Sequence, residues 1–176
     1  LLSTHGKELY SAIECLKKQG LVSKIGISIY DPSELDKLVR NFEIDIVQAP
    51  FNIVDRRLQS SGWLKQLKKE GVEVHARSVF LQGLLLLSSA EQIEKFGRWE
   101  ALWKSLEQWL MESKITSIQA CLGFVLANSY IDKVLVGVDT VKQLKEIISG
   151  AEPLALDVPD LFSSDDTDLV NPSRWG

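Results

Sequence analysis

One apolar stretch of the sequence contains residues that an ordinary buried strand would not carry. In "HARSVFLQGLLLL", residues 75–87, Arg77 and Ser78 stand among apolar neighbours, and Gly83 divides the apolar run. A buried guanidinium is costly unless it is paired, so Arg77 requires a partner. Two partners are open: a group outside this chain, or a carboxylate within it, such as Glu73.

Histidine and cysteine residues are too few and too scattered to form a metal site. The chain has two histidines, His5 and His75, and two cysteines, Cys15 and Cys121. Their spacing does not match a metal centre. Two distant cysteines make no disulfide framework, so we expect buried free thiols within helices. The sequence predicts no metal ligand.

The composition is typical of a globular protein with one domain. Of the 176 residues, 45% are hydrophobic and 25% are charged, and the formal net charge is −4. An acidic chain lacks the clustered basic surface that nucleic acids require. The apolar stretch around 84–87 is far too short to span a membrane, and residues 1–10 lack the pattern of a secretory signal. We therefore expect a cytoplasmic protein with neither a nucleic-acid nor a membrane partner.

Short apolar runs alternate with helical patterns along the chain. Asp31 is suited to cap a helix whose first position is Pro32. Strands separated by helical crossovers form a parallel sheet. We expect one domain over residues 1–156 and a turn-rich tail on the surface over 157–176. The patterns predict strands at 24–30, 44–49, 72–78 and 133–138, and helices at 7–19, from 31 onward, and at 61–71, 90–113, 116–128 and 140–149.

The alternation of residues within the strands favours a barrel over an open sheet. In 72–78, one face carries Val72, Val74 and Ala76, and the other carries Glu73, His75 and Arg77. Open sheets with helices on both faces have apolar residues on both. A polar inner face suits an α/β fold of the (β/α)8 TIM-barrel type, which needs roughly 200 residues or more. With four strands, this chain supplies about half of such a barrel.

Four motifs occur in order on the four expected strands, and together they resemble a known family. "GISIY", "VQAPFN", "RSVFLQGLL" and "LVGVDTVKQLKEI" are similar to strands five to eight of the aldo/keto reductases, and "NPSRW" is similar to the family's terminus. The resemblance implies a (β/α)8 barrel that reduces aldehydes and ketones with NADPH or NADH. "VHARSVFLQGLLL" is similar to members associated with surface-sugar metabolism.

The resemblance implies contacts to the nicotinamide from two strands. Ser28 and Gln48 match the serine and glutamine that hydrogen-bond the carboxamide. A hydroxyl and an amide suit a group that both donates and accepts. The family often has an asparagine after the serine, where this chain has Ile29. The alternative is that Ser28 and Gln48 are polar residues satisfied near strand ends.

The resemblance also implies contacts to the pyrophosphate. Arg77 stands where the family commonly has an aromatic residue stacked on the nicotinamide ring. A planar guanidinium can stack in the same way and adds positive charge. Loops after the seventh and eighth strands form the usual phosphate site of such barrels. The residues that match the loop around the pyrophosphate are Ser78, Leu81 and Gly83.

Residues 137–146 match the segment that holds the adenosine end of the cofactor. Gly137 begins it, and Glu146 aligns with an acidic residue near the adenine. Gln143 stands where many NADPH-dependent members have an arginine for the 2′-phosphate, and Lys142 could replace that arginine. The cofactor is therefore NADP or NAD. An exposed helix face is the alternative for Lys142 and Gln143.

The residues that perform the chemistry in this family are not recognisable in the sequence. The family's catalytic tyrosine, aspartate, lysine and histidine come from strands two to four, which would precede Leu1. Tyr10 and Tyr30 have no adjacent lysine and aspartate. We therefore assign no catalytic residue and expect this truncated chain to be inactive alone.

The family's role is reduction of a small-molecule carbonyl, whether aldehyde, ketone or sugar-derived. Unpaired sheet edges lead us to expect self-association, or pairing with the missing amino-terminal half. A non-catalytic half-barrel that binds a nucleotide or pairs with another chain is the alternative. A complete small α/β protein unrelated to the family is a third possibility.

Overall fold

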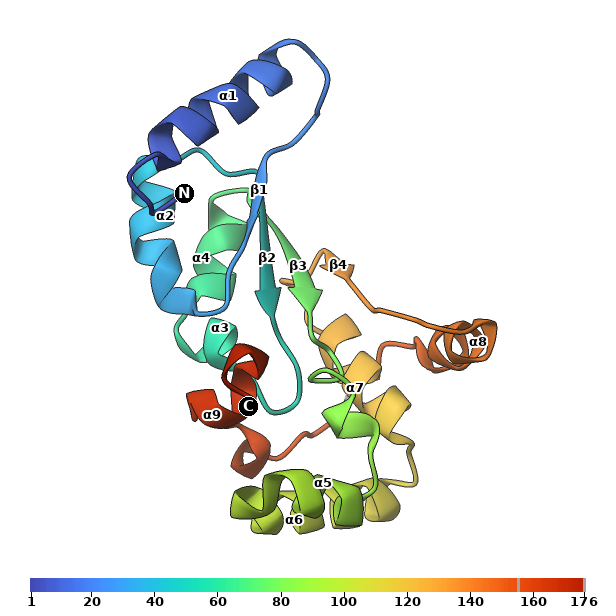
Figure 1. The fold of residues 1–176 in the computed structure, drawn as a ribbon. Helices are drawn as coiled ribbons and strands as arrows, with labels where there is room; N and C mark the ends of the chain where they lie inside the picture. The colour runs from blue at the N-terminus through green and yellow to red at the C-terminus, as the bar shows by residue number, and fades with distance from the viewer. Residues whose placement is uncertain (155, 176) are drawn as a thin grey trace.

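Four parallel strands form one sheet in the order of the chain (Figure 1). The computed structural model describes residues 1–154 and 156–175. The strands are β1 (Gly26–Ser28), β2 (Ile46–Pro50), β3 (Glu73–Arg77) and β4 (Lys133–Val134), in the order β1-β2-β3-β4. This confirms the expected parallel arrangement. β4 is shorter than predicted because the ladder ends where Leu135 donates its N–H to the carbonyl of Ala76, at 2.8 Å.

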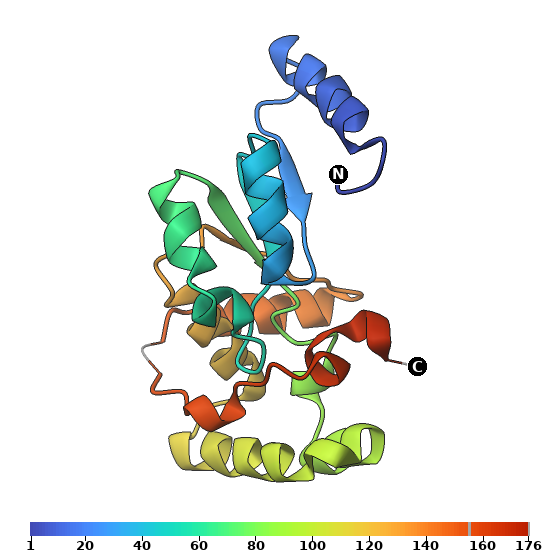
Figure 2. The same cartoon turned by 90° about the vertical axis from the view of Figure 1, so that its left-hand side faces the viewer.

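Helices follow the strands as crossovers. α2 and α4 lie on the same side of the sheet in both views (Figures 1 and 2). No helix in the described part of the chain combines the length and hydropathy needed to cross a bilayer. The α-helices are α1 (Gly6–Lys18), α2 (Leu35–Asn41), α3 (Arg57–Ser60), α4 (Trp63–Lys69), α5 (Ser89–Phe96), α6 (Glu100–Ser113), α7 (Ser117–Leu126), α8 (Val141–Gly150) and α9 (Thr167–Val170). The 3-10 helices are η1 (Pro32–Glu34), η2 (Leu84–Leu86), η3 (Gly97–Trp99), η4 (Asp160–Phe162) and η5 (Pro172–Arg174).

The helix predicted over 90–113 is wrong as one element, because the chain breaks it at Gly97–Trp99. α5 and α6 instead lie side by side beyond the carboxyl ends of the strands (Figure 2). The break frees the carbonyl of Phe96, which accepts a hydrogen bond from the indole nitrogen of Trp103 at 3.0 Å. Because Trp103 is itself fully buried, this bond fixes the turn between the two helices.

The two faces of the sheet differ as the alternation of residues predicted. Val47 and Val74 are fully buried on the face under α2 and α4. His75 on β3 is only partly buried and bonds to Glu73, with 3.2 Å between Nε2 and Oε2. Glu73 also pairs with Lys24. The polar face therefore carries a row of hydrogen-bonded polar groups, which suits the inner face of a barrel near its mouth.

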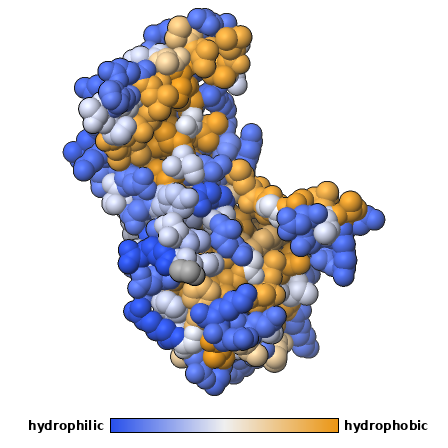
Figure 3. Space-filling view, viewed as in Figure 1, coloured by the Kyte–Doolittle hydropathy of each residue, from blue (hydrophilic) through white to orange (hydrophobic). Residues whose placement is uncertain are grey.

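Apolar side chains are exposed at both ends of the sheet. Leu9 and Leu16 of α1 are 54% and 41% exposed, and Val141 and Ile148 of α8 are 70% and 64% exposed. Figure 3 shows hydrophobic residues gathered over both regions. Contiguous apolar surface of this kind is typical of interaction surfaces. The two regions flank β1 and β4, the end strands of the described sheet.

The two cysteines differ in environment. Cys121 is buried in α7, and burial raises the pKa of its thiol to about 12, so it is unreactive. Cys15 is exposed, and the expectation that both thiols are buried is wrong for this one. The reason is that α1 packs on the body through contacts such as the one between Tyr10 and Phe42, whose ring centres lie 4.9 Å apart. Cys15 lies away from that contact.

The segment after α8 packs into the molecule. Its side chains Phe162, Leu169 and Val170 are buried in the core, although we expected a surface tail. Arg56, which is 7% exposed, holds the start of this segment. Its Nη2 donates to the carbonyl of Pro159 at 2.9 Å and its Nη1 to Oδ1 of Asp160 at 3.1 Å. An arginine at the start of α3 thus anchors a segment that is distant in sequence.

Replacing Arg56 with methionine is expected to release the segment around residues 156–165. The carbonyl of Pro159 loses its donor, and the destabilisation should be about 1–3 kcal/mol, as for other unsatisfied buried groups. Limited proteolysis should detect earlier cleavage in this segment. Asp160→Asn is the control, because the fully exposed carboxylate of Asp160 adds little to the anchor. Equal cleavage of Arg56→Met and the unaltered chain would contradict the assignment.

Candidate functional site

Arg77 has its partner within the chain, and that partner is aromatic. Its guanidinium carbon lies 4.6 Å from the centre of the Tyr30 ring. Its Nη2 donates to the carbonyl of Ile29 at 2.9 Å, and its Nη1 donates to Oγ of Ser78 at 3.0 Å. The alternative partner Glu73 is wrong, because that carboxylate pairs with Lys24. Within residues 1–154 and 156–175 no carboxylate forms an ion pair with Arg77, so its charge can attract an anion.

Ser28 and Gln48 meet on neighbouring strands. The parallel register places Ser28 beside Gln48, and the serine hydroxyl donates to Oε1 at 3.0 Å. Among the described residues no acceptor takes the amide hydrogens of Gln48. The pair therefore offers unused donors at the polar face of the sheet. This is the hydrogen-bonding capacity that a carboxamide ligand requires.

The loop after β3 has an unusual backbone. Ser78, Leu81 and Gln82 have φ angles of 56°, 46° and 54°, and Gly83 has 85°. Left-handed backbone is uncommon for residues other than glycine and gathers at functional sites. Within the described residues, no protein acceptor takes the N–H groups of Val79, Phe80, Gln82 or Gly83. Successive backbone N–H groups in a turn conformation can form a concavity in which an anion binds.

A cleft of about 690 Å³ opens beside this loop. It lies between the loop after β3, the segment after β4, and the start of α8. Leu81 does not line it, because that side chain is fully buried in the core. Six of the residues predicted to contact the cofactor line the cleft, namely Arg77, Ser78, Gly83, Gly137, Gln143 and Glu146.

Gln143 has a structural task at the far end of the cleft. Its Oε1 accepts from the backbone N–H groups of Asp139 and Thr140, at 2.8 and 3.2 Å. The hydroxyl of Thr140 accepts from the N–H of Gln143 in return, which completes a capping box for α8. Lys142 lies outside the cleft, and its side chain is 85% exposed with Nζ 3.9 Å from Glu146. The charged side chains that line this end are therefore those of Asp139 and Glu146.

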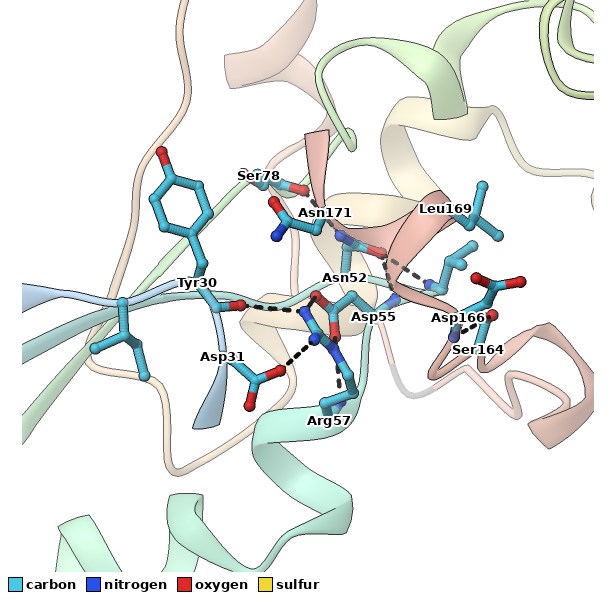
Figure 4. A network of polar contacts seen from close by, with 12 residues as sticks. Tyr30, Asp31, Asn52, Asp55, Arg57, Ser78, Ser164, Asp166, Leu169 and Asn171 are labelled. Atoms are coloured by element: carbon cyan, nitrogen blue, oxygen red, sulfur yellow. Dashed lines mark hydrogen bonds and ion pairs between the residues drawn. The ribbon is translucent and has the colours of Figure 1, made fainter. Parts of the chain in front are cut away.

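A buried polar network joins the ends of the first three strands (Figure 4). Arg57 donates to both carboxylate oxygens of Asp55, at 2.9 and 2.8 Å, to Asp31 at 2.9 Å and to the carbonyl of Tyr30 at 3.2 Å. Asp55 and Arg57 are 1% and 8% exposed. Burial raises the pKa of Asp55, while the bonds from Arg57 act in the opposite direction. This network therefore fixes Tyr30, the residue on which Arg77 stacks.

The sequence analysis assigned no role at the site to Asn52, Asp55 or Arg57. The signal was present in "FNIVDRR", where Asn52, Asp55 and Arg57 directly follow a buried strand. Polar residues at the carboxyl end of a barrel strand are positioned to serve a site. Composition alone could not separate them from ordinary loop residues, because burial decides the difference.

The aldo/keto reductase family model matches residues 3–158. The chain belongs to the aldo/keto reductase family. An uncharacterised oxidoreductase of Bacillus subtilis is 28% identical over 82% of this chain and 49% of its own length. The L-glyceraldehyde 3-phosphate reductase of Escherichia coli K12 is 25% identical over 93% of this chain and 54% of its own. This aldo/keto reductase chain thus spans about half the length of the curated relatives it matches.

Solved structures confirm the architecture. An aldo-keto reductase of Bacillus halodurans, in its holo form, is 24% identical and superposes with a TM-score of 0.69 over 85% of this chain and 51% of its own. Its apo form gives a TM-score of 0.71. Four parallel strands that cover half of a family barrel make this sheet a half-barrel, as the four predicted strands indicated.

The described residues contain no group of three histidine, cysteine or acidic side chains that could hold a metal ion. The arrangement at the strand ends instead combines a free positive charge, unused amide donors and backbone N–H groups. This set of donors fits a ligand with a phosphate group and a carboxamide.

Proposed function

We propose that this chain forms the nucleotide-binding half of an NAD(P)H-dependent reductase that converts a carbonyl compound to an alcohol. The observation that carries the proposal is the cleft beside the left-handed loop, into which Arg77 and the segment 137–146 converge. Substrates of the type proposed are aldehydes, ketones and sugar-derived carbonyls. Two relatives support this class, the L-glyceraldehyde 3-phosphate reductase and the NADH-specific methylglyoxal reductase of Escherichia coli K12, the latter 24% identical over 81% of this chain and 48% of its own length.

The proposal assigns a contact to each part of a nicotinamide dinucleotide, although Ser28 and Gln48 lie on the strands outside the lining of the cleft. Ser28 and Gln48 would bind the carboxamide, and Arg77 and Ser78 would lie near the pyrophosphate. When bound, the nicotinamide supplies a hydride to the carbonyl carbon, and the carbonyl oxygen takes a proton to give the alcohol. That proton needs a donor within hydrogen-bond reach. We expect the donor to come from chain that pairs with this half-barrel.

The lining of the adenosine end favours NADH over NADPH. Asp139 and Glu146 contribute carboxylates to the cleft there, while Lys142 lies outside it. A 2′-phosphate adds negative charge, which nearby carboxylates disfavour and ribose hydroxyls do not. Gln143, which replaces the family's arginine, is engaged in capping α8. Titration with NADH and NADPH side by side would measure this preference directly.

The exposed apolar surfaces support pairing with further chain. Those on α1 and α8 lie beside the end strands β1 and β4, so chain that continues the sheet would cover them. The amino-terminal half of a family barrel, joined to this chain or separate, is the partner that matches this geometry. Self-association through the same surfaces is the competing outcome. The cytoplasm, which holds NADH and NADPH, is the compartment we propose.

Gln48→Ala, introduced into the longest natural form of this chain, is expected to weaken NADH binding by about 1 kcal/mol, the value of a typical neutral hydrogen bond. Quenching of tryptophan fluorescence would give the dissociation constant. Gln66→Ala is the matched control, because the side chain of Gln66 donates to Glu70 on the exposed side of α4, away from the cleft. Unchanged affinity would remove Gln48 from the site. Absence of nucleotide binding in the unaltered protein would instead favour a half-barrel that only pairs with another chain.

A further inference from the structure

We propose that Asn52 is a positioning residue that holds the left-handed loop 78–83 in the shape needed to bind the nucleotide's phosphates. The inference rests on the proposed function, because it assigns a role within that site. Asn52 itself does not line the cleft and is 0% exposed. Its effect must therefore be transmitted through the backbone of its neighbours.

The side chain of Asn52 bonds in two directions (Figure 4). Its Oδ1 accepts from the N–H groups of Val54 and Asp55, at 2.9 and 2.8 Å. Its Nδ2 donates to the carbonyl of Ser78 at 2.9 Å. One atom thus supports the turn that follows β2, and the other supports the loop that follows β3. The two functions can be separated by substitution.

The bond to Ser78 falls at the position where the loop leaves its strand. The carbonyl of Ser78 also accepts from the N–H of Leu81 at 2.8 Å, so two donors fix it. Ser78 has a φ of 56°, a conformation that a serine rarely keeps without support from its surroundings. Val79 and Phe80, which follow that carbonyl, line the cleft, and no acceptor among the described residues takes their N–H groups. Loss of the donor leaves the loop free to return to ordinary backbone angles.

The buried network makes Asn52 a rigid support. The N–H of Asn52 donates to the carbonyl of Asp55 at 3.0 Å, and Asp55 is held by two bonds from Arg57. Arg57 also holds the carbonyl of Tyr30. The end of β1, the turn after β2 and the loop after β3 are therefore connected through buried polar atoms. A support of this kind sets the geometry of a site without touching its ligand.

Two substitutions separate the two functions of Asn52. Asn52→Asp has the same shape and, measured at a pH where the new carboxyl is ionised, retains acceptors for Val54 and Asp55 but lacks the donor to Ser78. Asn52→Ala lacks both. Asn41→Ala is the matched control, since the Nδ2 of Asn41 likewise donates to a backbone carbonyl, that of Lys37, at the end of α2. All three are made in the longest natural form of the chain. Hydrogen exchange of loop 78–83 and affinities for ADP and adenosine are measured.

We expect faster exchange in the loop for Asn52→Asp and Asn52→Ala alike, with strand amides of β2 and β3 still protected. Affinity for ADP should fall roughly tenfold in both variants. The reason is that a strained backbone costs free energy to hold, and a loop that has relaxed must be strained again on binding. Adenosine affinity should stay unchanged, because adenosine has no phosphate. Asn41→Ala should resemble the unaltered protein in each measurement.

Three results would overturn the inference. The first is unchanged exchange in the loop of Asn52→Asp. The second is a parallel loss of ADP and adenosine affinity, which would give Asn52 a general structural role. The third is unchanged ADP affinity despite a released loop. If the unaltered protein binds neither ADP nor NADH, the proposed function fails, and the phosphate role of Asn52 fails with it.

Discussion

Purified residues 1–176 are expected to oxidise no NADH or NADPH when an aldehyde is supplied. The proposed nucleotide contacts lie at the strand ends, but the carbonyl oxygen also needs a positioned proton donor. Tyr10 donates its hydroxyl to the carbonyl of Glu43, at the edge of the molecule where α1 packs. Tyr30 lies under the guanidinium of Arg77. Neither lies within a group of lysine and aspartate as a catalytic tyrosine of this family does.

Addition of the amino-terminal half of a family barrel is expected to restore reduction. The added strands would pair with the free edges of β1 and β4 and cover the apolar surfaces of α1 and α8. Burial of that surface contributes about 25 cal/mol per Å². Light scattering should show that the chain alone self-associates and that the mixture forms a defined complex. Absorbance at the reduced nicotinamide band would report turnover.

The complementation has an internal control. Residues 1–176 that carry Gln48→Ala should assemble with the added half and give lower activity at limiting cofactor. A monodisperse monomer of residues 1–176 that reduces an aldehyde with saturable kinetics would contradict the prediction. Tyr30 would then be the first proton donor to test, because its ring lies against Arg77, which lines the cleft.

Replacement of Arg57 with methionine is expected to cost roughly 3–5 kcal/mol of stability at neutral pH, the loss found when one partner of a buried ion pair is removed. Asp55 would remain buried without its two bonds, and Asp31 and the carbonyl of Tyr30 would lose a donor. Urea unfolding of the longest natural form should show a lower midpoint with an unchanged slope. Lys65→Met is the control, because it removes the same charge from an exposed position on α4.

The stability lost in Arg57→Met should become smaller at acidic pH. Burial already raises the pKa of Asp55 above its ordinary value, so protonation of this carboxyl favours the folded state as pH falls through that pKa. Without Arg57 the pKa rises further, and the protonated form is reached at higher pH. The difference in unfolding free energy between Arg57→Met and the unaltered protein should therefore shrink between pH 7 and pH 5. A difference that is constant over this range would exclude Asp55 as its source.

Strand order and the half-barrel architecture could be predicted because they depend on local patterns. The alternation in 72–78 identifies the buried face correctly, and helical crossovers require parallel strands. The break in the helix over 90–113 could not be predicted from periodicity. It depends on Trp103, whose indole nitrogen donates to the carbonyl of Phe96 only when α5 and α6 have packed together. Contacts between elements decide such details.

Part of the candidate site could likewise be predicted from the sequence, and part could not. Residues that lie on the strands, such as Ser28, Gln48 and Arg77, could be located from motif and register alone. The partner of Arg77 could not, because Tyr30 comes from a different strand and Glu73, its nearer choice in sequence, is taken by Lys24. Asn52 was missed for a related reason, since its role appears only when Ser78 is brought beside it.

The anchor at Arg56 has a consequence for how the protein is made. Its partner Asp160 follows 104 residues later in the chain, so a ribosome that adds about 5–20 residues per second completes this contact roughly 5–20 s after Arg56 is made. During that interval the segment that Arg56 holds, around residues 156–165, has not yet been made. The guanidinium can hydrogen-bond to water during this time. An apolar anchor of equal size would instead expose hydrophobic surface that binds chaperones and other nascent chains. An arginine at this position therefore adds no exposed apolar anchor to the unfinished chain.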